Sequence, residues 1–212
     1  MRQEVFENFD TSLDHQAMNA KMRLKPGTKR AEDFTEMLKA AEQVARPKAA
    51  VINCQPVVLE ANHIRLSDTV FVSELLWEKI REEKEVYPYL ITCGTELDAW
   101  AKGFDGIGRY WADEIMLRVL LNSQKQLVEK VAELSGHRQL SRVNPGFKRT
   151  WPITDQKPFF ELLGELPERL GVILTSSFLM DPAKSSTGIM FQSDEIIDEA
   201  EEERLLTQPY SG

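Results

Sequence analysis

The sequence predicts an α+β fold, a single domain in which helices flank a mainly antiparallel, twisted sheet. Patterns typical of helices and of strands do not alternate strictly along the chain, as a doubly wound fold would require. Two short β-type runs near residue 60 are separated by a turn typical of a hairpin. Further short runs between residues 171 and 192 indicate an antiparallel end to the domain.

The bulk composition is that of an ordinary globular protein. Of the 212 residues, 42% are hydrophobic and 28% are charged, which is enough for one sizeable core. The formal net charge of −8 argues against a general nucleic-acid binder, which needs a basic surface. No stretch approaches the roughly 18 apolar residues of a membrane span, and the first residues include no apolar signal region, so we expect a cytoplasmic protein. Cys54 and Cys93 are isolated, which favours buried thiols over a metal site.

We expect three segments along the chain. Residues 1–28 have few apolar positions and end in the breaker Pro26-Gly27, so they form an arm or irregular lead-in. Residues 29–193 form the α+β domain. Residues 194–212 begin with a dense acidic run, which is typical of a solvated helix or tail.

The first half of the domain should contain helices, a hairpin and a buried strand. Apolar residues after Thr28, a candidate N-cap, recur at the spacing of one helical face and stop before Pro47. Later elements are a strand at 49–52, a hairpin of 57–61 and 64–66, a helix capped by Ser73, a strand at 87–93 and a short helix with a capping box of Thr95 and Asp98.

The longest periodic segment runs from Gly108 to Leu134. Apolar residues lie nearly all round its first half, so we expect a central, buried helix. Asn122 and Gln126 lie four residues apart in its amphipathic second half and therefore share a face. Their amides either bond each other, contact a ligand or form ordinary polar surface.

The stretch 136–151 is the candidate site loop. Between two helical patterns it holds Arg142, Asn144, Pro145, Gly146 and Phe147. Pro145 fixes its own φ, and Gly146 admits backbone conformations that are closed to other residues. Arg142 can clamp a carboxylate with two hydrogen bonds, and Phe147 offers a flat face to a ring. From the residues alone, an ordinary polar connection is the alternative.

The sequence at the end of the domain predicts one more helix and the last strands. Thr154 or Asp155 can cap a helix that contains Phe159 and Leu163. β-type runs follow at 171–175, 178–180 and 189–192, with a turn of small residues at 181–188.

Three motifs in the second half occur together in a specific order. They are Arg142-Val-Asn-Pro-Gly-Phe147, Trp151-Pro152 and GVILTSSFLMDPAKSSTGIMF from Gly171 to Phe191. With the helix from Tyr110, this region resembles the activation domain of cobalamin-dependent methionine synthase. The first hundred residues match less specifically, through their order of elements and the segment 44–51, and resemble stand-alone relatives of that domain.

The resemblance implies a reactivation module. In the family, the domain binds S-adenosylmethionine and docks over the corrinoid, so that inactive cob(II)alamin is reduced and methylated again. The sequence shows no cobalamin-binding domain, so the resemblance implies cobalamin carried by a partner, which would be a corrinoid protein or methyltransferase. The module would be accessory to that methyltransferase, with no catalytic residue and no metal ligand of its own.

The family's ligand-binding positions transfer to this sequence with two departures. The positions that match the family's S-adenosylmethionine site are Arg142, Asn144, Gly146 and Phe147. Phe147 stands where the family usually has Tyr, so one hydroxyl is absent. The acidic residues that lie near the positively charged sulfonium in the family correspond to Asn122 and Gln126 here.

Three functions are consistent with these observations. The first is a stand-alone reactivation partner of a corrinoid methyltransferase, and the motifs favour it. The second is a binding or assembly module that keeps the fold and the corrinoid-protein contact without using S-adenosylmethionine. The third is an independent methyltransferase for a small substrate. Binding of S-adenosylmethionine separates the first from the second.

Overall fold

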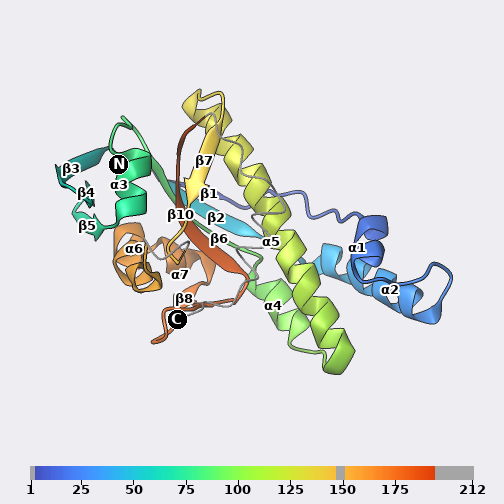
Figure 1. Cartoon of the computed structure of the whole chain (residues 1–212). Helices are drawn as coiled ribbons and strands as arrows, with labels where there is room; N and C mark the ends of the chain where they lie inside the picture. The colour runs from blue at the N-terminus through green and yellow to red at the C-terminus, as the bar shows by residue number, and fades with distance from the viewer. Residues whose placement is uncertain (1–2, 147–150, 194–212) are drawn as a thin grey trace.

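The computed structural model describes residues 3–146 and 151–193 of the chain. The described residues form a five-stranded sheet in the order β1-β2-β6-β10-β7 (Figure 1). Its strands are β1 (Gln3–Phe6), β2 (Lys48–Ile52), β6 (Tyr87–Thr92), β10 (Ser185–Gln192) and β7 (Leu140–Val143). All neighbouring strands in this sheet are antiparallel, which confirms the predicted α+β class.

Helices cover one face of the sheet (Figure 1). They are α1 (His15–Lys21), α2 (Lys29–Val44), α4 (Thr95–Ala101) and α5 (Gly106–Ser135). The first half of α5 is buried almost all round, as expected, and Trp111, Ile115 and Val119 lie in the core beside Tyr89 and Ile91 of β6. Helix α5 is therefore the central element of this layer.

A mixed layer covers the opposite face. It contains β3 (Pro56–Glu60), β4 (His63–Leu66), β5 (Thr69–Val72), α3 (Glu74–Ile80), the 3-10 helix η1 (Ile153–Asp155), α6 (Gln156–Leu163), α7 (Leu166–Leu170), β8 (Ile173–Leu174) and β9 (Met180–Asp181). A second core lies here, around the aromatic side chains of Phe71, Trp151 and Phe159. Because side chains alternate along a strand, β6 supplies Tyr89 to the first core and Leu90 to the second.

Two of the expected helix caps are present. The side chain of Thr28 accepts a hydrogen bond from the backbone of Ala31, and that of Ser73 accepts one from Leu76. The expected capping box at Thr95 is wrong. Gly94 takes the N-cap position of α4 with φ of +97°, and a Cβ there would lie 2.3 Å from the carbonyl oxygen of Arg46. The backbone of Arg46 comes so close to this position that only glycine fits. A sequence pattern gives no sign of such a contact.

The strands differ most from the expectation. Residues 140–143 of the expected loop form β7, and β10 begins at Ser185, inside the expected turn at 181–188. Ser185–Gly188 read as a turn because the residues are small, but here they pair with β6 in the middle of the sheet. The hairpin of β3 and β4 is present, and β5 extends it by a third strand.

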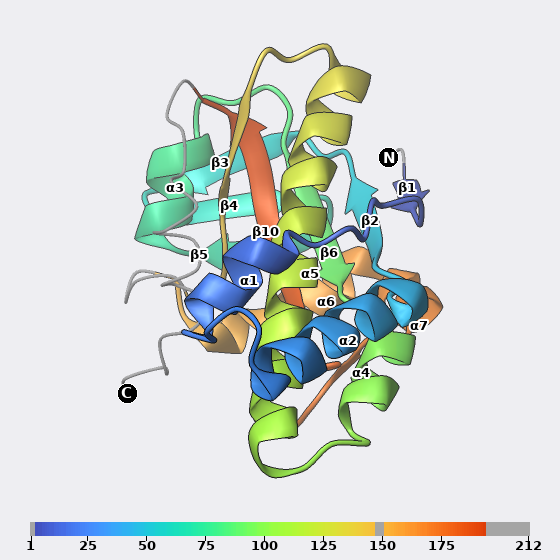
Figure 2. The ribbon, with the colours of Figure 1, turned by 90° about the vertical axis from the view of Figure 1, so that its right-hand side faces the viewer.

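The lead-in expected at residues 1–28 contains regular structure in its described part. Residues 3–6 add β1 to the main sheet, and Leu13 and Met18 lie in the first core. The segment between β1 and α1, here called the arm (residues 7–14), crosses over α5 (Figure 2). The acidic segment 194–212 lies outside the described residues. Within the described part of the chain, no helix has both the length and the apolar character to cross a membrane.

Candidate functional site

Arg142 is a strand residue and not a loop residue. It lies on β7 directly opposite Met190 of β10. Paired residues of antiparallel strands point to the same face of a sheet, and Met190 lies in the core beneath α5. The half-buried Arg142 side chain therefore belongs to the face covered by α5, on a strand at the edge of the sheet.

Asn144 fastens the end of β7 to the two central strands. Its Nδ2 donates hydrogen bonds to the Tyr89 hydroxyl at 2.8 Å, to the Ser186 hydroxyl at 3.2 Å and to the carbonyl of Thr187. A carbonyl only accepts, so the Thr187 contact fixes which amide atom faces the sheet. Both N–H groups of Asn144 are therefore used inside the protein. Tyr89 and Ser186 were missed by the sequence analysis as residues that support the site.

Gly188 leaves the space that the Asn144 side chain needs to form these hydrogen bonds. A Cβ at Gly188 would lie 2.6 Å from Asn144 Nδ2, 2.6 Å from the carbonyl oxygen of Val143 and 2.9 Å from the ring of Tyr89. Real Cβ atoms do not approach other heavy atoms so closely. The only signal for Gly188 in the sequence was its place in the motif from Gly171 to Phe191.

Gly146 connects the turn to Trp151 through a backbone hydrogen bond. Its φ is +85°, the conformation for which glycine was expected, and its N–H donates to the carbonyl of Trp151 at 2.7 Å. The Trp151 side chain is fully buried, and its Nε1–H donates to Asp155 at 3.0 Å. Burial raises the pKa of that carboxyl, and the Trp151 hydrogen bond opposes the shift. The turn is thus anchored on both sides. Phe147, between the anchors, lies outside the described residues.

The side-chain amides of Asn122 and Gln126 lie on α5, and their contacts differ from those of the residues at the end of β7. Gln126 Oε1 accepts the backbone N–H of Asp10 at 2.8 Å, and Nε2 donates to the carbonyl of Asp10 at 2.9 Å. Gln126 Nε2 also lies 3.3 Å from the backbone carbonyl of Asn122. In this structure Gln126 therefore holds the arm where it crosses α5 (Figure 2). Asn122, half-buried, lies one turn earlier on the same helix.

The structure thus brings Arg142, Asn144 and Gly146 together at the end of one strand, on a sheet against which α5 packs. It places Gln126 against the arm. The two cysteines take no part in this site. Burial raises the pKa of the Cys54 thiol to about 11 and that of the Cys93 thiol to about 12, so both are protonated at neutral pH. The expectation of buried thiols is confirmed.

The arrangement defines a class of fold: an α+β domain whose antiparallel sheet lies between a helical layer with one long central helix and a mixed layer. No protein-family model matches the sequence, and the search of curated proteins found no match. Among solved structures, the chain is similar to the crystal structure of the MetH reactivation domain bound to AdoHcy. The TM-score is 0.67 at 19% identity, over 93% of this chain and 81% of that one. The fold is that of the MetH reactivation domain, as the resemblance implied.

Proposed function

We propose that the chain is a stand-alone reactivation module. It binds S-adenosylmethionine and docks on a separate corrinoid protein, where it supports the reductive methylation of cob(II)alamin. The observation that carries the proposal is the shared fold, because the similar domain was solved with AdoHcy bound and the similarity extends over 93% of this chain. AdoHcy is S-adenosylmethionine without its methyl group, so a site that holds one matches most of the other.

The residues at the end of β7 fit the polar groups of this ligand. Arg142 offers a planar guanidinium, which suits a carboxylate better than a lysine would. Gly146 lets a ligand approach the backbone closely. The Asn144 fastening and the bond from Gly146 to Trp151 hold the turn in place before a ligand arrives, which lowers the entropic cost of binding. In this proposal Asn144 positions the turn and does not itself contact the ligand through its N–H groups.

The bound S-adenosylmethionine would supply the methyl group, and the chain's residues bind and orient it. Methyl transfer through a corrinoid requires the two cofactors to meet at the protein surface. Arg142 and the turn lie at an edge strand of the sheet, so a ligand held there is not enclosed on all sides by the sheet.

A second function is supported by the helix amides. Asn122 and Gln126 are neutral, and both polar atoms of the Gln126 amide are engaged by Asp10. A sulfonium cation gains little from neutral groups compared with carboxylates at the same positions. The chain would then be a corrinoid-protein binding or assembly module that keeps the fold without using S-adenosylmethionine.

Calorimetric titration of the whole chain with S-adenosylmethionine and with AdoHcy separates the two functions. Saturable binding of either ligand supports the reactivation module. If the folded protein binds neither ligand but binds the corrinoid protein, the assembly module is correct. Transfer of the methyl group to a small substrate without any corrinoid protein would instead establish an independent methyltransferase.

A further inference from the structure

The small sheet of β3, β4 and β5 leaves one apolar edge open to solvent. Strand β3 is an outer strand of this sheet and pairs there with β4 alone. Its consecutive residues Val57, Val58 and Leu59 are 40%, 45% and 50% exposed. Because side chains alternate between the two faces of a strand, the exposure of both Val57 and Val58 means that neither face of β3 is covered. Figure 1 shows this sheet at the left of the molecule, on the other side of the main sheet from α5.

The backbone of β3 is open along the same edge. Within the described part of the chain, the backbone hydrogen bonds of residues 56–60 are those of the ladder with β4. In an antiparallel pair, alternate residues of an outer strand direct their N–H and C=O groups away from the neighbouring strand. Such groups beside apolar side chains are a template for a further strand. A register shift between Val58 and Glu60 shortens the regular stretch of β3 without covering it.

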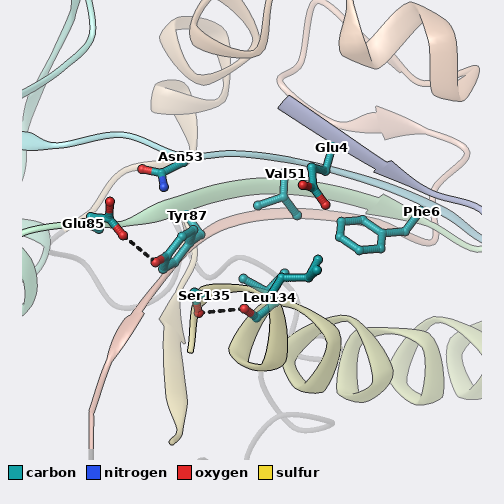
Figure 3. Close-up of a pocket in the computed structure, with 9 residues that line it drawn as sticks. Glu4, Phe6, Val51, Asn53, Glu85, Tyr87, Leu134 and Ser135 are labelled. Carbon is teal, nitrogen blue, oxygen red and sulfur yellow. Dashed lines mark hydrogen bonds between the residues drawn. The ribbon is translucent and has the colours of Figure 1, made fainter. Parts of the chain in front are cut away.

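The outer strand β1 of the main sheet has a different character. Glu4 and Phe6 of β1 line a cavity of about 200 Å³ beside the last turns of α5 (Figure 3). One face of β1 is thus directed toward the rest of the protein, and Glu4 gives this strand a charge, which is a common protection of natural sheet edges. Strand β3 has no charged residue before Glu60, its last residue. Of these two outer strands, β3 is therefore the better template for pairing.

The charges at this edge fit a second copy of the same chain. Arg65 of β4 is exposed, lies directly opposite Val57 and makes no ion pair with any described residue. The exposed Glu60 pairs with His63, and its carboxylate lies 3.6 Å from His63 Nδ1. His63 and Arg65 are two residues apart on one strand, so Glu60 and Arg65 belong to the same face of the sheet. The edge therefore has an apolar centre, with a cation toward one end and an anion at the other.

We propose that β3 pairs with β3 of a second copy, so that the two small sheets become one antiparallel sheet about a twofold axis. An axis at Val58 places Glu60 of each copy opposite Pro56 of the other. Glu60 then lies one residue along from Val57, on the same face as the Arg65 of that copy. Two equivalent ion pairs form, and the apolar side chains of the two strands pack together.

The expected dimer is weak. A contact between two short strands is smaller than a standard protein interface, so the Kd should be roughly 0.1 mM. The small sheet belongs to the layer opposite α5, whereas Arg142 belongs to the face that α5 covers. The dimer therefore leaves the Arg142 turn of each copy uncovered and does not depend on the function proposed for that turn.

Sedimentation velocity of the whole chain tests the dimer. Between roughly 10 µM and 0.5 mM we expect a reversible shift from monomer to dimer. Val58→Lys puts a charge on the β3 edge and should raise the Kd by about tenfold or more. The matched controls are Val5→Lys, at an exposed valine of β1, and Val72→Lys, at an exposed valine of β5. Both controls should dimerise like the wild type.

A charge reversal tests the twofold pairing itself. Arg65→Glu and Glu60→Arg should each raise the Kd by about fivefold or more, because each puts like charges together across the axis. The double variant forms the ion pair in the opposite sense, so its Kd should return to within about threefold of the wild type. Both residues are exposed, so these variants keep the fold, which circular dichroism checks. If Val58→Lys fails to fold, the charge reversal still decides.

Four results would overturn the proposal. A wild-type chain that stays monomeric over this range has no such interface. A dimer that Val5→Lys or Val72→Lys weakens as much as Val58→Lys forms at another surface. Growth beyond the dimer indicates a head-to-tail contact instead of a closed twofold pair. A double charge reversal that stays as weak as the single variants excludes the ion pairs across the axis.

Discussion

Gly188→Ala should destabilise the protein severely, because the new methyl group has no space. Its Cβ would lie 2.6 Å from both Asn144 Nδ2 and the Val143 carbonyl oxygen, and 2.9 Å from the Tyr89 ring. Forcing extra volume into a packed site costs about 1–3 kcal/mol. Displacing Asn144 weakens its bonds to Tyr89 and Ser186, each worth about 1 kcal/mol net. The free energy of unfolding should therefore fall by about 2–5 kcal/mol.

Urea denaturation followed by circular dichroism measures this loss. Gly108→Ala in α5 is the matched control, since the nearest atoms to its Cβ belong to the Phe104 side chain, the first at 3.3 Å, and alanine favours a helix by about 0.5–1 kcal/mol. That variant should be close to the wild type. Adding Asn144→Ala to Gly188→Ala should cost less than the sum of the single changes, because the clash with Nδ2 disappears. A free energy of unfolding for Gly188→Ala within about 0.5 kcal/mol of the wild type would refute the idea that Asn144 needs the space left by Gly188.

Three further predictions concern the proposed function. Arg142→Ala should weaken S-adenosylmethionine binding by about 1.5–3 kcal/mol in calorimetry, and equal affinity in a variant with an intact circular dichroism spectrum would remove Arg142 from the site. Phe147→Tyr restores the hydroxyl usual in the resembled family and should be tolerated or tighten binding. A melting curve that falls strongly would instead indicate a buried ring, because an unpartnered buried hydroxyl costs about 1–3 kcal/mol. The corrinoid protein in its cob(II) form should bind more tightly than its methylated form, since equal affinity shifts no population. The acidic segment 194–212 should make that binding weaker as salt rises, and pull-down of neither form with S-adenosylmethionine present would count against reactivation.

Helices α2, α3 and α5 were predictable because their signals are local. The periodicity of α5 extends over 30 residues, and the cap bonds of α2 and α3 are formed within three residues of Thr28 and Ser73. Each of these signals lies in one short window of sequence. For these three helices, tertiary packing had little left to change.

The strands of the site were less predictable because pairing is not local. Ser185–Gly188 contains only small residues and resembles a turn, yet β6, almost a hundred residues earlier in the chain, makes it a strand. The arrangement of Gly146 followed from residue type alone, since positive φ favours glycine. The role of Asn144 did not, because Tyr89 and Ser186 are 55 and 42 residues away in sequence.

The contact between Gln126 and Asp10 has a consequence for the order in which the chain matures during synthesis. The two residues are 116 positions apart, so the arm emerges from the ribosome long before its partner on α5 exists. Strand β1 has its own partner, β2, available much earlier. A nascent chain that stops before α5 therefore leaves the polar backbone of Asp10 in water. Completion of α5 engages both backbone groups of Asp10.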